Sequence, residues 1–565
     1  MQEMQATQPV QSLLRPRPPI SSRWVFLGIS ALSLLLLALV PPLISVNRYQ
    51  RRVSTSIGTS LGRPVHFDQV SLNLLPLPGF TITNFVVEED PAFGSEPIIR
   101  ANSVKATLRV SSLWRRRVEF SRISFAESSI NLVHDARGRW NFESILLQAA
   151  NIETAPTAQP QSGSTPRFPY IEATGARLNL KQGMEKTPFS LSDAEFALWL
   201  PDPQAWRMRI QGRPVRTDTS VSDGGSLQVE ATLGRAASLE SVRLDLQATW
   251  RGAALGEVSR LFFARDLGLR GDATLTANAR GDLSHNSVKT RLEITRMRRS
   301  DFVPEHDVSL DLECAGTALQ MFHAIADLRC SWPVPDSDGA TLALAGSVPN
   351  VLQLGSADVQ IGTARLPAAV LLNWLRVASS RIPPSLSASG LLSGSMYRST
   401  ENPPVWIGEA TLPELWLSGA ELTPSPLVLN NVFLHSSTRA SDTRQTSRPP
   451  SAATSTFLLS PVALPLGGKD PAILEASADG NGYSLHFSGT VAVRRLLALA
   501  AAVPQFGDGL SLVLPADRPE DPVRLDLSAH REWNGQQVWS DNLAHTKSSP
   551  IHRSRMDGHR KKRRR

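Results

Sequence analysis

The residues that could carry out chemistry are scattered along this 565-residue chain. Its eleven histidines show no HExxH or HxH spacing of the kind that holds zinc, and no GxxxxGK(S/T) or GxGxxG loop is present to bind phosphates. The densest group of ionisable side chains is Glu305, His306 and Asp307, between Asp301 and Asp311. Because this group has no second cluster beside it, an exposed turn is favoured over an acid–base or metal site. We therefore predict a protein that is not an enzyme and has no cofactor.

The two cysteines, Cys314 and Cys330, exclude a disulfide-rich scaffold and a CxxC metal knuckle. Cys314 continues the alternating apolar positions that begin at Val308, and Cys330 is in phase with Leu328 and Trp332. Neighbouring strands could join the two cysteines in a disulfide, which would persist in an oxidising compartment. The alternative is a pair of buried thiols that act as small hydrophobic side chains. Spacing alone does not choose between them, because a bridge requires Cα atoms within about 7 Å.

The formal net charge of +8 is concentrated at the C-terminus. Residues 551–565 hold eight Lys or Arg and one Asp, so the other 550 residues carry a net charge of only +1. No helix-turn-helix, RNP or zinc-finger pattern accompanies these charges, and we expect no nucleic-acid partner. For the tail, residues 541–565, a disordered solvated segment is favoured. The alternative is a basic arm that touches anionic lipid head groups.

Residues 24–46 form a stretch of 23 residues without a charged side chain. As a helix this stretch would span about 34 Å, enough to cross the hydrocarbon core of a bilayer. It is longer than the apolar part of a signal peptide, and no A-x-A cleavage site follows it before Arg48. An uncleaved transmembrane helix is therefore favoured over a cleaved signal peptide. Arginines stand in equal number on both sides, so flanking charge does not set its orientation.

After the apolar stretch, apolar and polar residues alternate with a period of two. The clearest segments are 70–74, 104–110, 130–132, 242–246, 292–294 and 308–312. Each is predicted to be a strand with one apolar and one polar face, which suits an antiparallel sheet with one face away from water. The 41 Pro and 36 Gly fall largely between apolar runs and favour many turns. We predict a mainly β, elongated and repetitive antiparallel body of roughly twenty to thirty strands.

Three stretches, 254–263, 366–378 and 493–503, have helical rather than alternating spacing. Similar strands follow the first two, at 269–275 and 386–392. The starts of the three helices lie 112 and 127 residues apart, which suggests a weak repeat of a strand–helix–strand module. We therefore expect a few short amphipathic helices within the β body.

Two polar, low-complexity segments divide the body. Residues 150–167 are predicted to be a flexible linker, and residues 436–456 a disordered loop. The predicted layout is a β region at 47–149, a β-rich repeat body at 168–435 and a C-terminal β module at 457–540, followed by the tail.

Short motifs occur in a fixed order between residues 61 and 146. The string GRPV at 62–65 precedes DPAFG at 90–94, the alternating segment 104–110 and GRWNF at 138–142. In order and spacing, these motifs resemble the N-terminal region of AsmA-family proteins. That region begins with a "GR.V" motif, contains a "D-P-x-F" turn and ends near "NW" or "NF".

The resemblance implies a single-pass protein of the bacterial inner membrane, with residues 1–23 in the cytoplasm and the β-rich body in the periplasm. Family members are implicated in outer-membrane assembly and, through a likeness to chorein-type bridge proteins, in glycerophospholipid transport. The implied cargo is phospholipid in an apolar β-groove on the order of 100 Å long, given strands about 4.8 Å apart. The alternative is a scaffold or regulator of outer-membrane protein targeting and insertion that binds envelope proteins through exposed strand edges.

Candidate groove-lining residues are the apolar positions of the first alternating segments. They are Val70, Leu72, Leu74, Val104, Leu108 and Val110. The alternative for each is an ordinary position in a β core.

Overall fold

The computed structural model describes residues 26–33 and 50–543 with internal gaps. The gaps fall at 74–75, 114–118, 136–138, 144–168, 183–184, 203–204, 222, 235, 237–239, 302, 305–307, 336, 352, 380–381, 399–404, 423–424, 440–453, 504–506, 515–521 and 534. Residues 26–33 are helical, whereas the rest of the predicted transmembrane segment and the whole predicted linker lie outside the described residues. Within the described residues, no helix has both the length and the apolar composition needed to cross a membrane.

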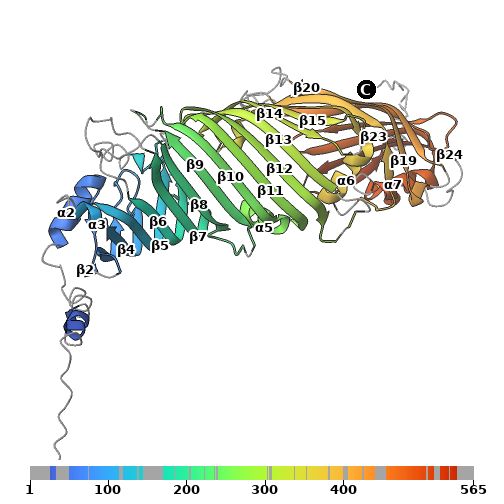
Figure 1. Ribbon diagram of the computed structural model, residues 1–565. Helices are drawn as coiled ribbons and strands as arrows, with labels where there is room; N and C mark the ends of the chain where they lie inside the picture. Colours follow the sequence, from blue (N-terminus) through green and yellow to red (C-terminus); the bar gives the residue numbers. More distant parts are fainter. Residues whose placement is uncertain are drawn as a thin grey trace, which may run out of the picture.

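One elongated, twisted sheet of 25 strands accounts for most of the described chain (Figure 1). Its N-terminal section comprises β1 (Val65–His66), β2 (Gln69–Asn73), β3 (Gly79–Val87), β4 (Ile99–Leu108), β5 (Phe120–His134), β6 (Tyr170–Gln182) and β7 (Glu185–Asp202). Its central section comprises β8 (Ala205–Arg216), β9 (Ser226–Gly234), β10 (Arg243–Ala254), β11 (Leu269–Asp282), β12 (His285–Arg299), β13 (Val308–Leu319), β14 (Ala324–Pro333), β15 (Thr341–Val348), β16 (Asp358–Pro367), β17 (Ser387–Ser389) and β18 (Leu391–Arg398). Its C-terminal section comprises β19 (Trp406–Ser418), β20 (Leu427–Arg439), β21 (Thr454–Leu464), β22 (Ala472–Ala478), β23 (Gly482–Ala492), β24 (Pro522–Glu532) and β25 (Val538–Asp541).

Strands that follow one another in the chain lie side by side in the sheet, so the mainly β prediction is confirmed. Two places hold a pair of short strands: β1 and β2 both pair with β3, and β17 and β18 both pair with β19. Every pairing is antiparallel except that of β5 with β6, which is parallel. The prediction of a wholly antiparallel sheet was therefore wrong at this one position. The chain between β5 and β6 is long enough for the crossover that a parallel pair requires.

Helices are few and short. They are α2 (Gln50–Leu61), α3 (Val110–Leu113), α5 (Leu255–Phe263), α6 (Ala368–Ala378) and α7 (Val493–Ala502), with 3₁₀ turns η3 (Leu354–Ser356), η4 (Ala420–Leu422) and η5 (Leu510–Leu512). The three helices predicted from apolar spacing are confirmed as α5, α6 and α7. Each begins where a strand ends, and none of the three has a side-chain cap at its start.

The first two helices join the sheet in the same way, which supports the predicted repeat. A β-bulge precedes each helix, and each bulge contains a residue with a positive φ, 66° at Gly252 and 55° at Arg365. After each helix the returning strand passes a glycine with positive φ, Gly271 or Gly390. A Cβ at Gly390 would lie 2.4 Å from the carbonyl oxygen of Glu414, so the close approach of two strands requires glycine there.

Two predicted boundaries need correction. Strand β20 continues to Arg439 and β21 begins at Thr454, so both ends of the predicted loop 436–456 are paired strand, and residues 440–453 lie outside the described residues. These strands also join the two predicted β-rich modules in one sheet. Alternating polarity was too weak at the loop ends to show that pairing continues, because serine and threonine are common both in strands and in loops.

Candidate functional site

A continuous apolar row crosses the sheet. Directly opposite residues on neighbouring strands share a face, so the row can be followed from strand to strand. Its members are Val70, Ile82, Val104, Phe125, Ala173, Phe196, Ile210, Val229, Ala248, Ala277, Thr290, Cys314, Cys330, Leu344, Ile361 and Met396. At about 4.8 Å per strand, this row is about 70 Å long.

A parallel row carries the same face to the last strand. Its members are Trp332, Leu342, Thr363, Gly394, Ala410, Leu434, Leu459, Ala476, Leu485, Ala529 and Trp539. The two rows together give the sheet one apolar face from β2 to β25. We call it the apolar face.

The apolar face is incompletely covered in the central section. Val229, Ala277, Leu344 and Ile361 are only partly buried. Among the described residues, these four belong to none of the buried hydrophobic clusters. An apolar face that stays partly exposed along a long sheet marks a site of interaction with another molecule.

The opposite face of the central section is polar and carries several ion pairs between neighbouring strands. Arg291 on β12 lies 2.7 Å from Asp311 on β13 and 3.0 Å from Glu293. Its guanidinium donates hydrogen bonds to both carboxylate oxygens of Asp311 and lowers the pKa of that carboxyl below its ordinary value. Charged pairs of this kind are stable in water. The polar face is therefore the outer, solvent-facing side of the sheet.

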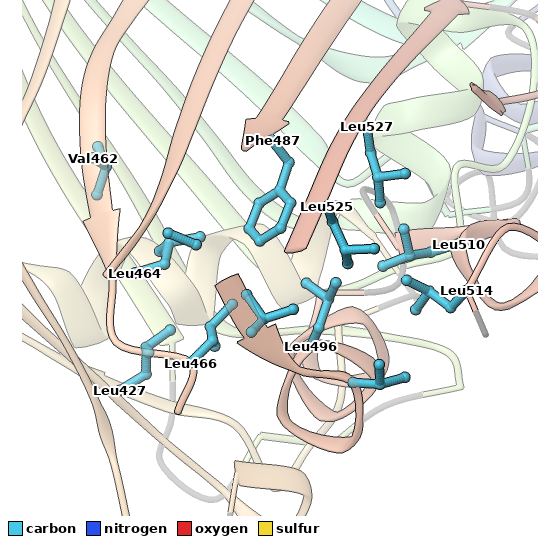
Figure 2. Packing of buried hydrophobic residues seen from close by; sticks show 13 residues of the cluster. Leu427, Val462, Leu464, Leu466, Phe487, Leu496, Leu510, Leu514, Leu525 and Leu527 are labelled. Atoms are coloured by element: carbon cyan, nitrogen blue, oxygen red, sulfur yellow. The ribbon is translucent and has the colours of Figure 1, made fainter. Parts of the chain in front are cut away.

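The apolar face is closed at the C-terminal end. Figure 2 shows leucines from β20, β21 and β24, with Phe487 of β23, converging on Leu496 of α7 and on Leu510 and Leu514. Leu527 is fully buried at this centre. Beside the cluster lies a cavity of about 240 Å³, lined by apolar side chains and one glycine. Its wall includes Leu459, Ala476, Leu485 and Trp539 of the second row, so the apolar face leads directly into this cavity.

The N-terminal end is closed as well, and this end holds most of the predicted groove-lining residues. Val70 and Val104 are buried in a cluster that includes Ile57 and Leu61 of α2, and Leu108 is also buried. Leu72 is half-buried, and Leu74 lies outside the described residues. At these positions the structure shows core packing rather than an open surface.

Val110 needs a separate correction. Strand β4 ends at Leu108, and Val110 begins α3 with its side chain 51% exposed. The amide of Arg109 donates to the carbonyl of Glu119, which turns the chain toward β5 before Val110 can join the sheet. The residues at the centre of the uncovered face, such as Leu344 and Ile361, were not selected from the sequence. Apolar and polar residues alternate at these positions too, but the same alternation occurs in strands whose apolar face is packed against a helix.

The two cysteines lie opposite each other in the apolar row. Cys314 on β13 pairs in register with Cys330 on β14, and the structure joins them in a disulfide. The disulfide thus belongs to the floor of the central section, where it ties two neighbouring strands together.

Two helices border the central section. Trp374 of α6 packs edge-on against Trp332, with ring centroids 5.4 Å apart. Phe262 of α5 lies 6.5 Å from Trp250 and 6.0 Å from Phe189, measured between ring centroids. These aromatic contacts bring the helices over the strand ends and leave the middle of the apolar face uncovered.

The short N-terminal motifs converge in space. Arg63 of the GRPV string lies 3.4 Å from Asp90 of the DPAFG string and donates to the carbonyl of Asn141 in the GRWNF string. The side chain of Asn141 is fully buried and donates to Glu89 and to the carbonyl of Asn131. Burial raises the pKa of Glu89, although Asn141 and Arg63 oppose this shift. The motifs therefore form a buried polar clamp and not a ligand site.

A second cavity, of about 990 Å³ and lined by both polar and apolar side chains, lies against β20 to β25. Within it, Ser484 Oγ is 3.0 Å from His530 Nδ1, and His486 Nε2 is 3.1 Å from Asp526. Hydrogen bonds from Asn542 and His486 lower the pKa of Asp526. The hydroxyl and the carboxylate contact different histidines, so neither pair forms a nucleophile–base–carboxylate relay.

One catalytic string in the sequence has a structural explanation. Residues 58–62, GTSLG, match the GxSxG pattern of hydrolases. They form the end of α2 and a left-handed turn at Gly62, not the strand-to-helix elbow that exposes a nucleophile. In the part of the chain that the structure describes, no three His, Cys, Asp or Glu side chains gather as possible metal ligands.

Comparison with known proteins gives one positive result. The model of the AsmA family matches residues 23–182, a range that contains the clamp and strands β1 to β6. No curated protein and no solved structure matches the chain.

Proposed function

Since the chain belongs to the AsmA family through residues 23–182, we propose that it is a non-enzymatic protein of the bacterial inner membrane that carries phospholipid in its periplasmic β body. In this proposal, the acyl chains of the phospholipid lie along the apolar face of the central section. By carrying this lipid, the protein contributes to outer-membrane assembly. The observation that carries the proposal is the uncovered apolar row between β8 and β18.

The physical basis is the match between an elongated apolar surface and an acyl chain. Each methylene removed from water contributes about 0.8 kcal/mol, and a linear chain can follow the row without any directional bond. The floor residues Leu344, Ile361 and Met396 offer no charge to an acyl chain, and the head group stays at the margin in water. The outer face, with ion pairs such as Arg291 and Asp311, is unsuited to this role.

A scaffold that binds envelope proteins and regulates their targeting or insertion is the second candidate. The observation in its favour is β25, a four-residue strand whose only described pairing is with β24. The other side of β25 could accept a strand from a partner. An open strand edge accounts for a binding site but gives no reason for an apolar face that runs through the central section.

The test is native mass spectrometry of the full chain, purified from a bacterial envelope, with extraction and identification of bound lipid. Leu344→Glu places a charge on the apolar floor, where it opposes an acyl chain. Ala345→Glu is the matched control, because Ala345 is the next residue of β15 and is exposed on the polar face. We expect phospholipid on the wild type and on Ala345→Glu, and its loss from Leu344→Glu.

Two results would overturn the lipid proposal. The first is a folded wild-type chain free of lipid, and the second is equal lipid retention by both variants. Either result would move support to the scaffold, for which β25 would then be the site to mutate.

A further inference from the structure

The two long margins of the sheet differ in structure. The helical rim is the margin at which β10, β16 and β23 end and α5, α6 and α7 begin. The loop rim is the opposite margin, formed by turns such as those between β11 and β12 and between β15 and β16. The pairing pattern places all three helices on one margin, as Figure 1 also shows.

Exposed apolar side chains gather on the helical rim. From β8 to β25, the large hydrophobic residues exposed at this rim are Phe262, Phe263, Leu267, Val303, Leu371, Leu375, Leu391, Trp416, Leu497 and Leu512. The described residues of the loop rim over the same strands include three, Tyr397, Trp533 and Val538. Phe263 is the most exposed aromatic residue of the helical rim, at 63%. An asymmetry of this size indicates that the helical rim contacts an apolar environment.

The charges of the three helices add a second property to the rim. Together α5, α6 and α7 contain one acidic residue, Glu257, and four arginines. Glu257 is paired with Arg260 of its own helix, 3.0 Å away. Arg494 of α7 is exposed, and Arg265 is exposed directly after α5. Short helices with exposed apolar side chains and flanking arginines match the interface of a bilayer with anionic lipids.

We propose that the helical rim is a membrane-docking surface, on which α5, α6 and α7 lie in the head-group region of a bilayer that contains anionic phospholipid. The apolar side chains of the rim enter the acyl boundary, and the arginines contact phosphate groups. The sheet then stands on its long margin with the loop rim away from the membrane. This arrangement holds whether or not the apolar face carries lipid.

A bilayer fits the rim better than a second copy of the chain does. Two helical rims brought together would place α6 and α7, which contain three arginines and no acidic residue, against the same helices of the second copy. Like charges at an interface oppose association. An anionic lipid surface offers the complementary charge to α6, to α7 and to the exposed Arg265 beside α5.

The test places an environment-sensitive fluorophore at single cysteines of the full chain. Its two native cysteines are joined in a disulfide and do not compete for the label. Phe263→Cys and Leu375→Cys report on the helical rim, Tyr397→Cys on the loop rim and Leu344→Cys on the apolar floor. The labelled chain is reconstituted in phosphatidylcholine vesicles with and without phosphatidylglycerol, and quenching by lipids that carry a spin label on the acyl chain is measured.

We expect strong quenching at Phe263→Cys and Leu375→Cys in vesicles with phosphatidylglycerol, and little at Tyr397→Cys. Arg494→Glu should weaken docking by at least about fivefold, measured at the Leu375→Cys label. Equal quenching at both rims, or at neither, would overturn the proposal. Quenching confined to Leu344→Cys, with none at the two rim cysteines, would also overturn it, because lipid would then reach the apolar face and not the helical rim. A blue shift that depends on protein concentration and not on lipid would instead identify a second copy.

Discussion

The central and C-terminal sections of the sheet are built from the same kind of strand and use it differently. In both, leucines and alanines alternate with polar residues and occupy one face. In the C-terminal section, α7 and η5 pack on that face, and Leu527 is fully buried. In the central section, none of the described residues forms such a layer over Leu344 or Ile361, which stay partly exposed.

This difference shows that alternation fixes which side chains share a face, whereas the covering element decides whether that face is a core or a surface. A core stabilises the fold, and an open face remains available to another molecule. The contrast can be tested by substitutions in the central section and in the C-terminal section.

The largest effect is expected from Leu527→Ala. Removing a fully buried leucine side chain leaves a cavity and should destabilise the C-terminal section by about 2–5 kcal/mol. The matched change Leu344→Ala in the central section should cost about 1 kcal/mol, because that side chain is already partly in water. Hydrogen exchange of β23, β24 and β15, read by mass spectrometry, measures both. Similar losses of protection at the two sites would mean that the central face is covered.

The second change removes the disulfide with the double substitution Cys314→Ser and Cys330→Ser. The bridge closes a loop with a sequence separation of 16 residues, and its loss should destabilise the β13–β14 hairpin by about 3 kcal/mol. Among the described residues, α6 packs on Trp332 at one end of these strands, and the bridge lies away from that contact. Hydrogen exchange of the hairpin with and without reductant is the measurement. Wild type in reductant should match the double variant, and unchanged protection in both would show that the bridge is dispensable.

The third change probes the junction at which a covering helix returns to the sheet. Gly390 has a positive φ, and an added Cβ would be in close contact with the backbone of Glu414. We therefore expect Gly390→Ala, at the α6 junction, to lower the free energy of unfolding by about 1–3 kcal/mol. Gly252→Ala, at the α5 junction, has a positive φ but open space around the added Cβ. Its cost should be smaller, about 1 kcal/mol. Urea unfolding of both variants, followed by tryptophan fluorescence, measures the added cost of the larger φ and the close approach at Gly390, and equal costs would show that neither adds to the strain found at Gly252.

The smallest effect is expected on the outer face. The pKa of Asp311 is lowered in the folded chain by Arg291. The pair therefore contributes stability at neutral pH, and this contribution is lost as the pH falls below the ordinary pKa of Asp and through the lowered folded value. Arg291→Gln should change the unfolding midpoint slightly near neutral pH, and the difference should shrink as the pH falls below the ordinary pKa of Asp. High salt should remove the difference, because the pair is exposed. A difference that survives low pH would contradict this account.

Much of the sheet could be predicted from the sequence. Residues 70–73 and 104–108 of the first two alternating segments lie in β2 and β4, and the segment 308–312 lies in β13. The three helices appear where apolar spacing changes from two to about 3.6. These features are local, so they can be read from neighbouring residues.

The features that could not be predicted depend on distant residues. The parallel pairing of β5 with β6 depends on the path of a long connection, and the clamp joins Arg63 to Asn141, 78 residues away. The selection of Val70 and Val104 as lining residues missed the cover supplied by α2. Leu344 has the same alternation as Leu527, so only the placement of α7 distinguishes the open face from the core.

The pairing of each strand with its neighbours in sequence also bears on how such a body could change in length during evolution. Nearly every contact in the sheet is made with the adjacent strand, so the architecture is close to one-dimensional, as in repeat proteins. An even number of strand positions separates α5 from α6 and α6 from α7, and this parity keeps all three on one margin. An inserted hairpin preserves the parity and lengthens the body, whereas a single added strand would send every later helix to the opposite side. Length in this architecture is therefore inherited in steps of two strands.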